Sequence, residues 1–479
     1  MNGEQVFELG IAGEIIIFGY LAIIFAIGIF MARYIKDFRD YLMGAGKLGM
    51  ILLAGTVLAT QWGGVTFLGI SGFAYQNLYQ GVWYAWGAAA RFLFWAFFLA
   101  VVIRKVRPYT VSEWFAARFD VKNGLLISLM NLIVGLGLLG SQFVAIGTIA
   151  HTFMGWDLET AIVLGAILVT IYTVASGIVG VAATDIVQIV VSLLGAIIMI
   201  IAANIEFGSF AEVREVLPAE FFDHAEPWGF VFMITIFFLW LADLPLQYAN
   251  QRMISARTTK IAFYAPIFGA LSYLLVTYIT PALGAYARVA LPELEVADAA
   301  FPQLTAYLLP GPLAGLVAAA LLAVIMSSGD SYLLGPSTLV INDFYRAFKP
   351  EASQRQVLFY ARIATIVYLL LGLWAALAFQ VIIGLILTFL VFGWAILPAY
   401  FASTMSRKVT ASASFWSILV GGVINGILIT WPPEAFADYP RYYTGWIGFA
   451  AAIVILVVGT LLSKKKGDEA ISDAIKQMP

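Results

Sequence analysis

A cluster of polar residues interrupts an apolar segment near residue 330. The segment reads LLAVIMSSGDSYLLGPSTLV and contains Ser327, Ser328, Asp330 and Ser331. In a helix Ser327 and Ser331 share one face, with Ser328 beside them. Hydroxyls, together with carbonyls freed at a helix break, suit a hard monovalent cation. The alternative is structural, because serines also bond their own helix or let helices pack closely.

Three charged residues stand in equally apolar surroundings. Asp185, followed by Gln188, opens the segment DIVQIVVSLLG and is either a cation ligand, a gate charge or an interfacial residue favoured by the helix dipole. Arg91 lies in the middle of WYAWGAAARFLFWAFF, where a charge costs about 2.5–3.5 kcal/mol on insertion scales. Arg91 could bind a substrate carboxylate, form a structural ion pair or reach an interface, and Asp243 presents the same choice.

The composition indicates which elements must position these residues. The chain has 479 residues, of which 62% are hydrophobic and 11% charged, with a net charge of −2. These values exclude a soluble globular enzyme, a disordered chain and a basic nucleic-acid binder. The chain has no cysteine and two histidines, which excludes thiolate chemistry and makes a multi-histidine metal site unexpected. No Ser/His pair lies within the apolar segments, so an intramembrane enzyme is not expected.

Apolar runs long enough to cross a bilayer predict an all-α polytopic membrane protein with one membrane domain over residues 1–479. The first span covers 10–32, a core covers about 48–403, two further spans cover 410–463, and 464–479 is a cytoplasmic tail. The thirteen predicted spans are 10–32, 48–75, 79–103, 122–149, 157–178, 181–203, 228–251, 262–287, 311–342, 356–378, 380–403, 410–430 and 443–463.

The distribution of basic residues predicts the orientation. With the N-terminus outside, 22 of the 26 Lys and Arg residues fall in cytoplasmic segments, Arg252 among them. Because the Lys/Arg bias sets topology, we expect an outside N-terminus and a cytoplasmic C-terminus in the plasma membrane.

Two spans carry helix-breaking residues. Gly63-Gly64 interrupts the second span and Pro245 the seventh, five spans later. Transporters built from inverted repeats place broken helices at such corresponding positions, and the breaks form the binding site. The pattern therefore favours a 5+5 inverted-repeat core like that of amino-acid transporters, although Gly and Pro are common in membrane helices anyway.

Several motifs, in this order, resemble the sodium/solute symporter family, which includes proline, galactose, pantothenate and sialic acid symporters. The motifs run from about Asp40 to Ser412 and are DYLMGAGKLG, LATQWGGVTFLGISGFAY, GIVGVAATDIVQ, QYANQRMISA and MSSGDSYLLGPS. The resemblance implies sodium as the co-transported ion, a small solute and the lipid bilayer as partners, and no nucleic acid.

The resemblance also implies site residues. The sodium site common to the family falls on Ala59, Trp62, Val324, Ser327 and Ser328. A second cation site of some members, for sodium or a proton, falls on Asp185, Asp330 and Ser331, with Asp330 in place of a hydroxyl. The substrate cavity falls on Gln61 and Tyr248. Gln247 and Asp243, which flank Pro245, and Arg91 in the middle of the third span are further substrate candidates. A sugar-binding Glu of the galactose symporter falls near Ala85 here, which counts against a hexose.

We therefore expect a sodium-coupled symporter that imports a small polar organic solute, an amino acid or carboxylate being favoured, by alternating access. One alternative is a symporter for a sugar or other neutral solute. Another is a membrane solute sensor acting through a separate partner, because no output domain follows the last span.

Overall fold

The fold is described from a computed structural model covering residues 9–35, 41, 48–106, 108–223 and 229–463. Within these residues the regular elements are helices, with one isolated β-bridge between Leu48 and Ala256. The predicted tail 464–479 and most of the motif DYLMGAGKLG lie outside the described residues.

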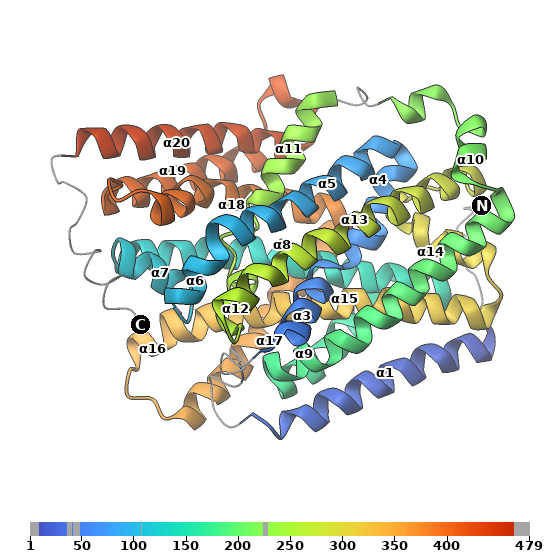
Figure 1. Cartoon of the computed structure of the whole chain (residues 1–479), viewed down its shortest axis with the longest axis horizontal. Helices are drawn as coiled ribbons and strands as arrows, with labels where there is room; N and C mark the ends of the chain where they lie inside the picture. The colour runs from blue at the N-terminus through green and yellow to red at the C-terminus, as the bar shows by residue number, and fades with distance from the viewer. Residues whose placement is uncertain (1–8, 36–40, 42–47, 107, 224–228, 464–479) are drawn as a thin grey trace.

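Long helices run roughly along one common direction, and shorter ones cap their ends (Figure 1). The main helices are α1 Gly10–Ala32, α3 Met50–Gln61, η2 Val65–Gly69, α4 Ile70–Gln76, α5 Leu78–Phe94, α6 Val101–Val106, α7 Val111–Arg118, α8 Val121–Met154, α9 Leu158–Phe207, α10 Phe210–Val216, α11 Gly229–Leu241, α12 Gln247–Ser255, α13 Thr259–Ala290, α14 Ala300–Leu308, α15 Gly311–Leu339, α17 Gln354–Phe379, α18 Ile382–Met405, α19 Ala411–Thr430 and α20 Gly445–Leu462.

Among the described residues, ten helices are long and apolar enough to cross a membrane. The pair Met50–Gln61 and Val65–Gln76, bent by 52°, makes an eleventh if it is one span. The predicted spans 157–178 and 228–251 correspond to the shorter apolar stretches Leu158–Ile171 and Gly229–Leu241. The protein is thus an all-helical, multi-pass membrane protein with ten or eleven spans by length and composition, and the count of thirteen stays a prediction.

The second span breaks where two glycines were expected to break it. Helix α3 ends at Gln61, and Trp62 leaves the helical region with φ −90° and ψ 75°. A Cβ atom on Gly63 would lie 2.6 Å from the Ser328 hydroxyl oxygen of α15, and one on Gly64 would lie 2.6 Å from the Ala145 side chain of α8. Only glycine therefore lets these three helices meet at the break.

The seventh span also breaks as predicted. Helix α11 ends at Leu241 and α12 begins at Gln247, with Pro245 in the turn between them. The Asn131 amide of α8 donates to the Pro245 carbonyl (3.3 Å), and its oxygen accepts the Gln247 backbone N–H (2.8 Å). The neighbouring helix thus satisfies backbone groups that the break frees, as an apolar environment requires.

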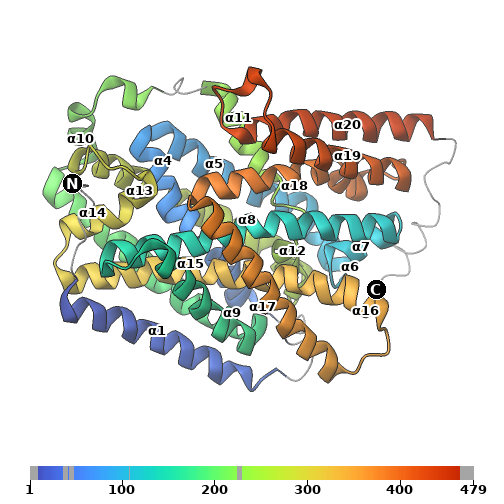
Figure 2. The ribbon, with the colours of Figure 1, turned by 180° about the vertical axis from the view of Figure 1, so that it is seen from behind.

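The breaks lie inside the bundle, between two peripheral layers. Helix α15 packs against α3, α8 and α9, and 25 of its residues are buried. Helix α1 lies at one edge against α9 and α15, while α19 and α20 pair at the opposite edge beside α18 (Figures 1 and 2).

Helix α9 contains both the fifth and sixth predicted spans and is kinked between them. Gly177 has φ 54° and ψ −162°, a conformation essentially reserved for glycine. A Cβ atom there would lie 2.5 Å from the Tyr41 carbonyl oxygen and 2.5 Å from its ring. The kink therefore needs glycine for both backbone and packing reasons.

We predict that Gly177→Ala lowers the thermal unfolding temperature, because the strained conformation alone costs on the order of 1–3 kcal/mol. Gly426→Ala in α19 is the matched control, since its new Cβ would meet its nearest neighbour at 3.5 Å. Equal unfolding temperatures for the two variants, measured in detergent, would show that the kink tolerates a side chain.

Candidate functional site

The break after α3 faces two serine hydroxyls of α15. Ser327 Oγ donates to the Ala59 carbonyl (2.8 Å) and lies 2.9 Å from the Val324 carbonyl. Ser328 Oγ donates to the Thr60 carbonyl (2.9 Å) and lies 3.2 Å from the Val324 carbonyl. All five residues are buried. Two helices thus bring five oxygens together in an apolar interior, which is the donor set that a hard cation prefers.

The structure brings Ala59, Val324, Ser327 and Ser328 of the predicted sodium site into direct contact. Trp62 forms the start of the break, and its ring packs edge-on against Phe67 at 6.0 Å between centroids.

Two further residues at this break were missed by the sequence reasoning. The Thr60 carbonyl accepts from Ser328, and Gln142 of α8 accepts the backbone N–H of Gly64 (2.9 Å). The only signal for Gln142 was a lone amide within the apolar run GLLGSQFVAIG.

A second polar cluster lies next to the first, where α3, α9, α12 and α15 meet. Asp185 Oδ2 accepts from the Thr56 hydroxyl (2.5 Å), and Asp330 Oδ1 accepts from the Thr173 hydroxyl. Both carboxylates are fully buried and lie within electrostatic range of each other. The structure therefore places two of the three predicted second-site residues, Asp185 and Asp330, in one region.

Arg252 of α12 is a member of this cluster that the sequence reasoning misplaced. The count of basic residues used to predict the membrane orientation placed Arg252 in a cytoplasmic loop, but this residue is 2% exposed. Its guanidinium donates to the Tyr248 carbonyl (2.7 Å), the Thr56 carbonyl (3.2 Å) and the Ser331 hydroxyl. Its charge also acts on Asp185 and Asp330.

Ser331, the third predicted member of the second cation site, is bonded to this guanidinium. Its hydroxyl also donates to the Ser327 carbonyl and lies 3.0 Å from the Thr60 hydroxyl. A guanidinium donates and never accepts, so a cation next to Ser331 would face a fixed positive charge.

A third network joins the two helix breaks. Arg91 of α5 and Asp243, in the turn after α11, form a fully buried ion pair at 2.6 Å. Gln61 Oε1 accepts from the other terminal nitrogen of Arg91, and the Tyr248 hydroxyl donates to the second oxygen of Asp243. The guanidinium also lies 4.0 Å from the Trp240 ring centroid. Four of the five predicted substrate residues thus form one network.

Gln247, the fifth predicted substrate residue, has other partners. Its side-chain oxygen accepts the backbone N–H of Val111 (2.9 Å), and its amide donates to the Tyr109 carbonyl (3.2 Å). As the first residue of α12, it directs its side chain to the N-terminus of α7 and ties the seventh span to that segment.

A cavity of about 850 Å³ lies between the end of α8 and the segment 290–303. Asp298 lines it and accepts the backbone N–H of Ile382 (3.0 Å) at the start of α18. Burial raises the pKa of the Asp298 carboxyl to about 6, although two backbone N–H groups act to lower it. Phe301 packs against Phe67 of η2 at 6.1 Å, so this segment covers the break from one side.

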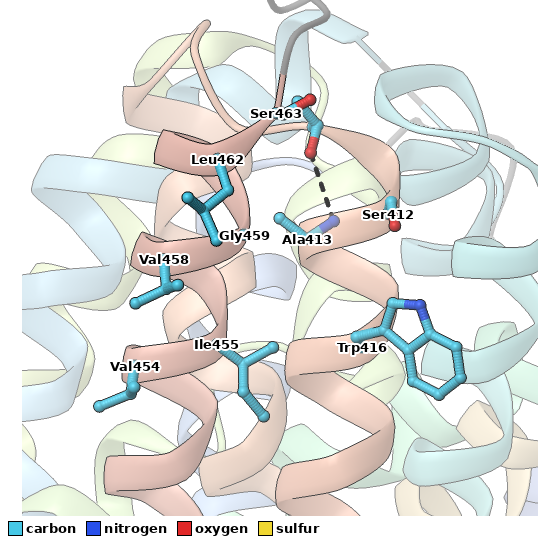
Figure 3. A pocket seen from close by; sticks show the side chains of 10 residues that line it. Ser412, Ala413, Trp416, Val454, Ile455, Val458, Gly459, Leu462 and Ser463 are labelled. Atoms are coloured by element: carbon cyan, nitrogen blue, oxygen red, sulfur yellow. Dashed lines mark hydrogen bonds between the residues drawn. The ribbon is translucent and has the colours of Figure 1, made fainter.

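A small space of about 10 Å³, lined by Tyr248 and Tyr332 among others, lies beside the ion-pair network and holds no more than about one water. Figure 3 shows a separate groove of about 510 Å³ between α19 and α20, lined mostly by apolar side chains such as Trp416 and Val458. None of the candidate site residues lines that groove.

The family model and the sequence relatives point to one family. The family model described as "Sodium:solute symporter family" matches residues 41–421. The sodium/pantothenate symporter of Haemophilus influenzae is 28% identical over 397 aligned positions, which cover 77% of this chain and 80% of that protein. The sodium/proline symporter of the same bacterium is 25% identical over 504 positions, covering 96% and 95%.

A solved structure shares the fold. It is the substrate-bound, outward-open state of a Na⁺-coupled sialic acid symporter, with a TM-score of 0.82 at 24% identity. The match covers 96% of this chain and 99% of that one. At this identity the likeness shows the fold alone, and the named substrates differ among the relatives.

We predict that Asp243→Asn destabilises the substrate-free protein by about 3–5 kcal/mol, because it leaves the Arg91 guanidinium buried without a counter-ion. The measurement is the unfolding temperature in detergent, with the exposed Asp438→Asn as the matched control. The double variant Arg91→Met, Asp243→Leu removes both charges and should recover most of the loss. Unfolding of Asp243→Asn at the wild-type temperature would contradict the buried pair.

Proposed function

The chain belongs to the sodium:solute symporter family, and we propose that it imports a small polar organic solute together with sodium by alternating access. Sodium would bind between α3 and α15, and the solute at the network that joins the two helix breaks. As a membrane transporter of this family it is not an enzyme, and sodium is a co-transported ion rather than a resident cofactor.

The group of oxygens from Ala59, Thr60, Val324, Ser327 and Ser328 is the observation that carries the sodium assignment. A serine hydroxyl has two acceptor lone pairs besides its hydrogen, so rotating the hydrogen away presents oxygen to an ion. Sodium would then hold the broken end of α3 against α15 through ion–oxygen contacts, in place of two hydrogen bonds. The Trp62 carbonyl, which follows in the break, is a further proposed ligand.

The Arg91–Asp243 ion pair favours a substrate that carries a carboxylate group. A substrate carboxylate could replace Asp243 at the guanidinium, but this would leave Asp243 buried and unpaired, which is unfavourable. A zwitterion avoids that penalty, since its ammonium group can pair with Asp243 while its carboxylate pairs with Arg91. The network therefore favours an amino acid over a simple anion, with Gln61 and Tyr248 orienting it. A sugar or other neutral solute, the second candidate, would have to leave the ion pair intact.

The sodium gradient is sufficient for accumulation. One charge crossing 100 mV yields about 2.3 kcal/mol, and a tenfold gradient adds about 1.4 kcal/mol. Together these allow roughly 500-fold accumulation at one-to-one coupling. A second cation near Asp185, Asp330 and Ser331 would raise that limit.

The membrane arrangement proposed with this function has thirteen spans, an outside N-terminus and a cytoplasmic C-terminus in the plasma membrane. The Lys/Arg bias supports it even with Arg252 removed from the count, because 21 of the other 25 basic residues still fall on one side.

We predict that Ser327→Ala and Ser328→Ala each raise the sodium concentration for half-maximal uptake by about tenfold, because each removes one ligand worth roughly 1.4 kcal/mol. The assay is uptake of labelled amino acids and organic acids into proteoliposomes under an imposed sodium gradient. Ser337→Ala is the matched control, since this hydroxyl of the same helix bonds the Leu333 carbonyl (2.6 Å). Unchanged sodium dependence in both variants would rule out this site.

A further inference from the structure

The groove between α19 and α20 is open along the surface of this helix pair (Figure 3). Ala413 and Gly459 form its base, where the two helices meet, because a Cβ atom on Gly459 would lie 3.0 Å from the Ala413 Cβ. Its walls are larger side chains, and Trp416 and Val458 remain 52% and 45% exposed. Its volume of about 510 Å³ falls within the range of ligand pockets, about 300–1,000 Å³.

The length of the groove matches one leaflet of a bilayer. Val454, Val458 and Leu462 of α20 are four residues apart and line it from one helix face. At about 1.5 Å per residue, the segment from Val454 to Ser463 rises about 14 Å. This is about half of the 30 Å hydrocarbon core of a bilayer. The groove therefore has the length that one phospholipid acyl chain occupies.

The two ends of the groove differ in polarity. Ser412 and Ser463 lie at one end, while Val454 lies toward the other, apolar end (Figure 3). The polar end coincides with the start of α19 and the end of α20, which are ends of two membrane-spanning candidates. It therefore lies where such helices meet the lipid headgroups. A phospholipid has the same polarity, with a polar headgroup above apolar chains.

Basic residues predominate around this polar end. Arg118 of α7 donates to the Ser406 carbonyl (2.7 Å), and the Asn123 amide of α8 donates to the Ala411 carbonyl (3.0 Å). The segments 118–123 and 406–412 thus meet here, and they carry four positive charges and one negative charge: Arg118, Lys122, Arg407 and Lys408 against Asp120. Lys122, Arg407 and Lys408 are exposed. Basic residues at the end of a groove between membrane helices suit an anionic headgroup.

We propose that the α19–α20 groove binds one anionic phospholipid, with an acyl chain along Trp416 and Val458 and its phosphate at the basic end. A neutral phospholipid would fit the apolar walls equally well but would leave the excess positive charge without a partner. The inference goes beyond the proposed sodium-coupled function and does not depend on it, because the groove lining shares no residue with the candidate ion and solute sites. Since the basic end joins α7, α8 and α19, the lipid would stabilise that junction.

The test is native mass spectrometry of the purified full chain, titrated in detergent with phosphatidylglycerol or with phosphatidylcholine of the same acyl chains. We expect the wild type to retain one phosphatidylglycerol more tightly than phosphatidylcholine. Arg407→Ser combined with Lys408→Ser should weaken phosphatidylglycerol binding by about thirtyfold, because each basic residue near an anionic lipid contributes about 1 kcal/mol. Val458→Trp should remove the tightly retained lipid by filling the groove.

Each variant has a matched control. Lys349→Ser combined with Arg355→Ser removes two exposed basic residues near the start of α17, and Val457→Trp adds the same bulk at an exposed valine of α20 that does not line the groove. Both controls should retain phosphatidylglycerol as the wild type does. Unfolding temperatures in the same detergent show whether each variant is folded.

Equal retention of the two lipids by the wild type would overturn the proposal, because the basic end would then not select an anion. Equal weakening in the Arg407/Lys408 variant and in its control pair would show general charge attraction and no site. Wild-type retention in Val458→Trp would place the lipid elsewhere. A protein that co-purifies with the chain and excludes phosphatidylglycerol from the groove would also contradict the proposal.

Discussion

The break between α3 and η2 is the constraint on which the rest of the site depends. A broken helix in an apolar interior must have its free N–H and C=O groups satisfied by neighbours. Gln142 of α8 satisfies one N–H, and Ser327 and Ser328 of α15 satisfy carbonyls. Gly63 lets the serines approach, because any side chain there would overlap Ser328. The same interactions that stabilise the break thus assemble the oxygens proposed to bind sodium.

Buried charge is the second organising feature, and it is arranged in two different ways. Arg91 and Asp243 form a closed ion pair that joins the two helix breaks, so each charge of the pair neutralises the other. Around Arg252, two buried carboxylates, those of Asp185 and Asp330, face one guanidinium. Both networks touch α3, through Gln61 in one and Thr56 in the other. Movement of α3 would therefore change the geometry of the proposed solute site and of the proposed ion sites together.

Much of this arrangement could be predicted from the sequence, because it depends on polar and charged residues that lie within apolar segments. Apolar runs predicted the helices, and Gly63-Gly64 and Pro245 predicted the breaks. Ser327, Asp185 and Arg91 were predicted as site residues because they are polar residues isolated in apolar runs. The pairing of Arg91 with Asp243 needed the tertiary structure, because 152 positions separate them.

Other parts could not be predicted from local pattern. Arg252 resembled a loop residue because its segment is polar, yet α12 is buried between other helices. The direction of the Gln247 side chain depends on the rotation of α12, which the local sequence does not define.

We propose that sodium replaces the hydrogen bonds between α3 and α15 and stabilises the break. Hydrogen–deuterium exchange of the full chain in lipid nanodiscs tests it directly, by comparing sodium chloride with choline chloride and potassium chloride. Sodium alone should slow exchange of the backbone amides over residues 59–69 and leave those of α19 unchanged. Equal exchange over residues 59–69 in all three salts, or equal slowing by potassium, would mean that sodium does not stabilise the break.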